Sequence, residues 1–126
     1  MAPTLTLAFV LVCAAVAIGG GLAIQYLRGP TARRPPWPIP VVHGALGAAG
    51  LAVLLLVLRR GLPPSATGTT GFGPAAAVLV SVALMLGLAI AHAAWRRRRP
   101  AGVLVGIHVS VAVAGFVVLW ALLGLG

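Results

Sequence analysis

Four long apolar runs, separated by arginine-bearing connectors, constrain this chain more than any other feature of its sequence. The chain has 126 residues, 61% of them hydrophobic, with nine arginines, no lysine and no acidic residue. A helix of about 20 apolar residues crosses the hydrocarbon layer of a bilayer, because each residue advances it by about 1.5 Å. The pattern predicts one all-α membrane domain over residues 1–126, a four-helix bundle with helices at 5–27, 41–58, 74–95 and 102–123.

The distribution of the arginines predicts the orientation of this bundle. The first and third connectors hold seven of them (residues 28, 33, 34 and 96–99), and the second connector holds two (59 and 60). Basic connectors stay on the cytoplasmic side, so we expect both termini outside. The arginine-rich, lysine-free composition is typical of a GC-rich bacterial gene, which suggests a bacterial inner membrane. The arginines flank apolar runs instead of forming a solvated face, which favours the lipid bilayer over nucleic acid as partner.

The second and fourth runs resemble each other around a histidine. The stretches "VVHGALGAAGLAVLLLVLRRG" and "GIHVSVAVAGFVVLWALLGLG" align with His43 on His108. Upstream, "GLAIQYLR" from Gly21 matches "GLAIAHAA" from Gly87 over four residues. A two-helix unit returns the chain to the side where it began, so we expect two tandem hairpins related by a pseudo-two-fold axis along the membrane normal. The two histidines then face each other, although the expected helix starts place His43 nearer the interface by up to about a turn.

Each histidine heads a stripe of small residues on its helix face. Positions four and seven residues further along share that face with the histidine. These positions hold Gly47, Gly50, Ala112 and Gly115. A flat macrocycle standing between two helices needs small residues there, because bulky side chains collide with the ring. Two neutral imidazoles can supply both axial ligands of a haem iron.

On these residues the chain resembles the membrane b-type cytochromes, whose haem is clamped between histidines on separate helices of a four-helix bundle. The resemblance covers the two histidine segments and the four-span topology. It implies haem b as the cofactor, His43 and His108 as its axial ligands, and the four small residues as its lining. The arginines at 33, 34 and 96–99 lie at the same end and can neutralise haem propionates. The short connectors leave an electron partner to meet the bundle at its surface or, like a quinone, within the membrane.

Two other interpretations stay open. A metal site of three histidines adds His92, since imidazoles suit zinc, copper or iron, although no carboxylate or second thiolate supports it. A cofactor-free accessory subunit of a larger respiratory or photosynthetic complex uses small residues for helix packing alone, with other membrane subunits as partners. Thiol redox chemistry lacks a second cysteine beside Cys13, and acid–base hydrolysis lacks a carboxylate. We therefore expect an electron carrier or an accessory subunit rather than an enzyme.

Overall fold

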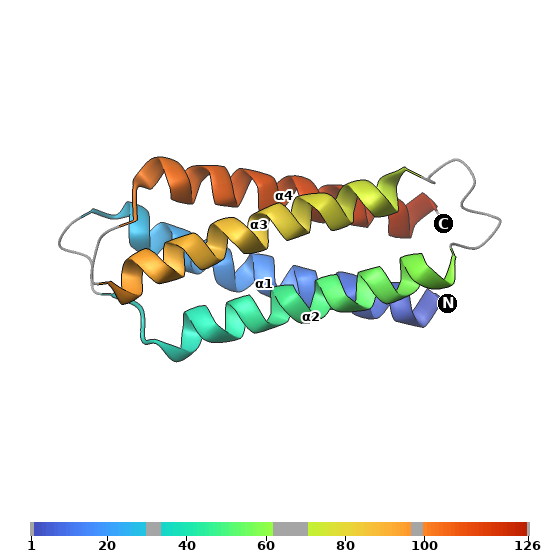
Figure 1. Ribbon diagram of the computed structural model, residues 1–126, viewed down its shortest axis with the longest axis horizontal. Helices are drawn as coiled ribbons and strands as arrows, with labels where there is room; N and C mark the ends of the chain where they lie inside the picture. Colours follow the sequence, from blue (N-terminus) through green and yellow to red (C-terminus); the bar gives the residue numbers. More distant parts are fainter. Residues whose placement is uncertain (1, 30–33, 62–70, 97–99, 126) are drawn as a thin grey trace.

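The computed structural model is an all-helical bundle, and it describes residues 2–29, 34–61, 71–96 and 100–125. Its helices are α1 (Ala2–Leu27), α2 (Pro38–Arg60), α3 (Phe72–Trp95) and α4 (Gly102–Leu125). Each is long and apolar enough to cross a membrane, which confirms the predicted four-helix membrane architecture. The helices alternate in direction, so the termini, the end of α2 and the start of α3 lie at one end of the bundle (Figure 1).

The start of α2 differs from its predicted position, and this difference changes the depth of His43. The helix begins at Pro38 instead of residue 41, and its first turn also contains Pro40. Proline is tolerated in a first turn because the amide hydrogens there have no partner within the helix. His43 therefore lies five residues after the start of α2, and His108 lies six residues after the start of α4. The expected mismatch in depth of about a turn was wrong, since one residue corresponds to about 1.5 Å.

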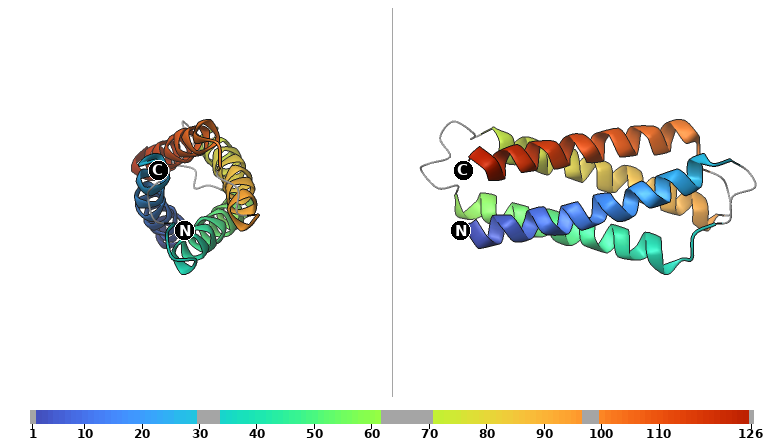
Figure 2. Two further views of the ribbon diagram at one scale, coloured as in Figure 1. Left: turned by 90° about the vertical axis from the view of Figure 1, so that its left-hand side faces the viewer. Right: turned by 180° about the vertical axis from the view of Figure 1, so that it is seen from behind.

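The helices stand at the corners of a square in chain order, so α1 is diagonal to α3 and α2 is diagonal to α4 (Figure 2). The closest packing occurs within the two hairpins, α1 with α2 and α3 with α4, while α1–α4 and α2–α3 contacts join them. The hairpins run in the same sense, as the tandem repeat predicts. Their histidine-bearing helices are consequently the two that face each other across the bundle axis.

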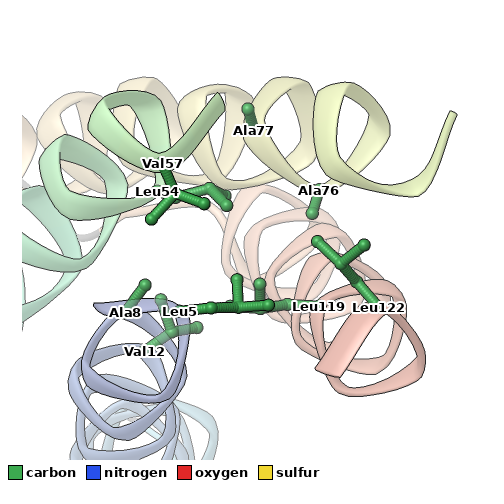
Figure 3. Close-up of a cluster of buried hydrophobic side chains, with 9 residues drawn as sticks. All are labelled: Leu5, Ala8, Val12, Leu54, Val57, Ala76, Ala77, Leu119 and Leu122. Atoms are coloured by element: carbon green, nitrogen blue, oxygen red, sulfur yellow. The ribbon is translucent and has the colours of Figure 1, made fainter. Parts of the chain in front are cut away.

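Two separate clusters of buried apolar side chains fill the interior. The larger cluster lies toward the end that holds the termini, and Figure 3 shows its side chains converging from all four helices: Leu5, Ala8, Val12, Leu54, Val57, Ala76, Ala77, Leu119 and Leu122. The smaller cluster lies toward the opposite end and comprises Ala23, Ile90 and Val105. His108 lies one turn after Val105 of the smaller cluster, and His43 lies between the start of α2 and Leu54 of the larger cluster; we call the level of the bundle that holds these two histidines the histidine layer.

Burial repeats between the hairpins, with one offset for α1 and α3 and another for α2 and α4. Ala8 of α1 and Ala76 of α3 are both fully buried, and so are Leu54 of α2 and Leu119 of α4. The first pair is 68 residues apart and the second 65, because the connector within the second hairpin is shorter. The interior of the bundle therefore preserves the tandem repeat at the level of single side chains.

Candidate histidine site

His43 reaches from α2 across to the backbone of α1. Its Nδ1 lies 2.8 Å from the carbonyl oxygen of Ala15. Because a carbonyl oxygen can only accept, Nδ1 carries the hydrogen and Nε2 presents its lone pair. The ring lies over Gly19, one turn further along α1, where an added Cβ would stand 2.6 Å from the Cε1 atom of His43. Only glycine leaves room for the imidazole in this position.

His108 repeats this arrangement in the second hairpin. Its Nδ1 lies 2.9 Å from the carbonyl oxygen of Ala83 on α3, so the same tautomer is fixed. The ring lies over Gly87, again one turn after the alanine, where an added Cβ would stand 3.2 Å from Cε1 of His108. Each hairpin thus contains a complete unit of histidine, backbone acceptor and glycine.

The two imidazoles meet across the bundle axis. Their ring centres are 6.0 Å apart and their planes are inclined at 82°. The facing of His43 and His108 that the repeat predicts is therefore present. Since α2 and α4 are diagonal in the square of helices, it is the side chains that bridge the axis, while their orientation is set by α1 and α3.

The histidine pair has the donor set and spacing of a two-imidazole metal site. A metal bound by one nitrogen of each ring, through bonds of about 2 Å, has ring centres about 6 Å apart, because each centre lies about 1 Å behind its nitrogen. The observed separation of 6.0 Å matches this value. The Nδ1–H bonds to backbone carbonyls leave Nε2 as the coordinating atom in both rings. The donor type and the spacing of the two imidazoles are therefore compatible with a metal held between them, and haem binding stays a prediction.

The four small residues expected to line a ring occupy two different environments. Gly50 and Gly115 are buried at helix contacts: a Cβ on Gly50 would stand 2.7 Å from Val12, and one on Gly115 would stand 3.2 Å from Leu79. A Cβ on Gly47 would meet no atom within 4 Å. Ala112 is half-buried. The small size of Gly50 and Gly115 thus serves close helix packing, and a role of the four residues in lining a cofactor stays a prediction.

His92 does not join the pair. Its side chain is exposed in the last turn of α3. Among residues 2–29, 34–61, 71–96 and 100–125, no group of three or more histidine, cysteine or acidic side chains can hold a metal. The three-histidine alternative does not correspond to this arrangement, and Cys13 points outward as an exposed side chain of α1.

Positive charge gathers at the end of the bundle nearer the histidines. Arg34 precedes α2 and Arg96 follows α3, and both side chains are exposed at that end. The other arginines considered for haem propionates, at 33 and 97–99, lie outside the described residues. Trp37 and Trp95 lie at the same end and are 77% and 86% exposed, as expected for side chains at a membrane interface.

The residues that hold the imidazoles, namely Ala15, Gly19, Ala83 and Gly87, were not predicted from the sequence. The predicted match of Gly21 with Gly87 was wrong, because the structural equivalent of Gly87 is Gly19. The signal was available: "AFVLVCAAVAIG" at 8–19 and "AAVLVSVALMLG" at 76–87 agree at six of their 12 positions, including the alanine and glycine beside each histidine. This alignment has the offset of 68 residues that the buried positions of α1 and α3 share.

No protein-family model matches the chain, and comparison with curated proteins and with solved structures finds no match. Function therefore has to be argued from the paired histidines and their surroundings.

Proposed function

We propose that the protein holds a b-type haem between His43 and His108 and carries electrons within a membrane. The observation that supports the proposal is the duplicated geometry, in which two imidazoles with Nδ1 fixed by a helix carbonyl are brought to a centre separation of 6.0 Å. A metal-binding histidine usually donates the N–H of its other ring nitrogen to a hydrogen-bond acceptor, because this bond fixes the tautomer and orients the coordinating nitrogen.

The residues of this chain favour electron transfer over catalysis. A haem bound by two imidazoles exchanges single electrons between its ferric and ferrous states. The carbonyl groups of Ala15 and Ala83 hold both rings in their orientation. If His43 and His108 both held the iron, they would leave no coordination position for a substrate. Arg34 and Arg96 lie at the correct end to neutralise propionates.

The surroundings of the bundle restrict the partner and the compartment. The outer faces of the helices are apolar, and the described connectors are too short to form a soluble domain. An electron partner therefore meets the bundle from the membrane, as a quinone does, or as another membrane subunit at its surface. We place the protein in a bacterial inner membrane with its arginine-rich end in the cytoplasm, on the strength of the arginine distribution.

The experiment is a reduced-minus-oxidised visible spectrum of the detergent-purified protein, produced with an ample supply of haem, together with quantification of extracted haem. A sharp α band typical of b-type haem, at one haem per chain, is the expected result. His43→Ala and His108→Ala should each remove the low-spin spectrum, because one axial ligand is lost. His92→Ala is the matched control, since this exposed histidine lies outside the pair and its loss should leave the spectrum unchanged.

A colourless wild-type protein that is folded and supplied with haem contradicts the proposal. The protein is then better described as a cofactor-free accessory subunit of a larger membrane complex, with the imidazole pair serving as an internal helix contact. Retention of the full low-spin spectrum by both single variants would also contradict the assignment of these two histidines as ligands.

A further inference from the structure

A shallow apolar hollow lies between the two helices of the first hairpin, near the start of α2. Ile18 of α1 and Pro38, Ile39 and Val42 of α2 line a volume of about 210 Å³. The lining contributes no polar surface. Ile39 and Val42 are 40% and 48% exposed, so the hollow is open to the surroundings of the hairpin. The hollow offers no hydrogen-bond partner to a quinone ring or a hydroxyl group, and its chemistry suits a hydrocarbon chain.

The positively charged arginines at the same end of the hairpin favour an anionic ligand. The chain has nine arginines and no acidic side chain, so it has a large excess of positive charge. Arg28 follows α1 and Arg34 precedes α2, so both lie at the end of the hairpin where α2 begins, with side chains exposed. Anionic lipid headgroups are the usual counterions of such basic connectors. Trp37, directly before Pro38, is 77% exposed and marks the headgroup level.

The distance between the hollow and the arginines matches the length of a lipid acyl chain. Ile18 lies ten residues before Arg28, which corresponds to about 15 Å along α1. That distance is about half the thickness of the hydrocarbon layer of a bilayer, the depth that one acyl chain fills. We propose that the first hairpin binds one anionic phospholipid, with part of an acyl chain in the hollow of Ile18, Pro38, Ile39 and Val42 and its phosphate held by Arg28 and Arg34.

The test measures lipid retention by native mass spectrometry. Delipidated protein in detergent is titrated with phosphatidylglycerol and, separately, with phosphatidylcholine of the same acyl chains. Wild-type protein should retain one phosphatidylglycerol and little phosphatidylcholine. Val42→Phe fills the hollow and should weaken the retention of phosphatidylglycerol about fivefold, because the acyl chain then loses its apolar contact with the hollow. Replacing Arg28 and Arg34 by glutamine should weaken it about tenfold or more.

The repeat supplies matched controls. Ile107 is the equivalent of Val42 in α4 and is 49% exposed, so Ile107→Phe adds the same ring at the same depth without filling this hollow. Replacing Arg59 and Arg60 by glutamine removes the same charge from the opposite end. Neither change should alter retention.

Three results overturn the proposal: equal retention of phosphatidylcholine, undiminished retention in Val42→Phe, or an equal loss when Arg59 and Arg60 are replaced. The last result would indicate general attraction of anionic lipid to a basic protein. If Val42→Phe does not fold, as judged by helicity and elution from gel filtration, Ile39→Phe fills the same hollow and takes its place in the test.

Discussion

Each imidazole in the core of this bundle is held by two features of a neighbouring helix: a carbonyl oxygen and a missing side chain. His43 donates to Ala15 and lies over Gly19, and the glycine is needed because any Cβ would stand within 2.6 Å of the ring. A polar side chain inside a membrane is costly unless it is hydrogen-bonded. The hydrogen bond offsets the free-energy cost of burying the imidazole at this depth, and the glycine leaves the space that the hydrogen bond requires.

Gly19→Ala should therefore act on His43. The added methyl group must displace the ring, which breaks or strains the bond to Ala15, and we expect a loss of about 1–3 kcal/mol in stability. Thermal unfolding in detergent, followed by circular dichroism, measures the effect. Gly20→Ala is the control, because a Cβ there meets nothing within 4 Å and alanine favours a helix. Equal melting temperatures for the two variants would contradict this account.

The pairing of His43 and His108 could be predicted from the sequence, but their backbone acceptors could not. A carbonyl group belongs to every residue, so nothing in the letters marks Ala15 or Ala83 as an acceptor. The glycine next to each ring was hidden for another reason. In helices built from alanine, glycine, valine and leucine, short matches such as that of Gly21 with Gly87 arise easily. Only the longer match that starts at residues 8 and 76 gives the register in which Gly19 is equivalent to Gly87.

At the scale of helices, the close approach within each hairpin depends on a second glycine. A Cβ on Gly50 would stand 2.7 Å from Val12 Cγ2 and 3.3 Å from the backbone nitrogen of the same residue, so α1 and α2 touch at backbone distance. Gly115 has the same relation to Val80 of α3, at 3.2 Å and 3.4 Å. Small residues permit such approaches in membranes, where association relies on packing. These contacts lie next to the histidine layer and keep each carbonyl within reach of its imidazole.

Gly50→Leu should consequently separate α1 from α2. The nearest atoms include backbone, which cannot move aside as a side chain can, so we expect destabilisation of about 1–3 kcal/mol or more. Gly47→Leu, one turn earlier in the same helix, is the control because its position is open. Thermal unfolding in detergent measures both. The packing argument fails if Gly47→Leu is as damaging as Gly50→Leu.

Helix number and direction followed from apolar length and arginine spacing, because both reflect the thickness of a bilayer. The start of α2 was less predictable. Four prolines, at 35, 36, 38 and 40, surround it, and proline is as compatible with the first turn of a helix as with a connector. The difference of three residues decides whether His43 is level with His108, so an ordinary uncertainty in a helix boundary concealed the most informative feature of the site.

For the whole molecule, the tandem hairpins share a direction, and the arginines are unequal at the two ends. Seven arginines lie in the first and third connectors, against two in the last turn of α2. The arginine-rich end of the bundle is also the end nearer His43 and His108 and nearer the apolar hollow of the first hairpin. If the arginine-rich end faces the cytoplasm, the histidine pair and the hollow both lie in the cytoplasmic leaflet, which is the leaflet rich in anionic lipid.

Orientation is the prediction that belongs to this scale. Alkaline phosphatase fused after residue 126 should be active in a bacterial host, and green fluorescent protein inserted in the third connector should fluoresce, because basic connectors remain in the cytoplasm. Replacing the four arginines at 96–99 by glutamine changes the bias from seven against two to three against two, so a mixed orientation is expected, with activity lowered about twofold. Replacing Arg59 and Arg60 instead should leave the orientation intact. A fluorescent fusion at residue 126, together with an inactive phosphatase fusion at the same residue, would contradict the predicted orientation. It would show that the termini are cytoplasmic and that the histidine layer lies in the outer leaflet.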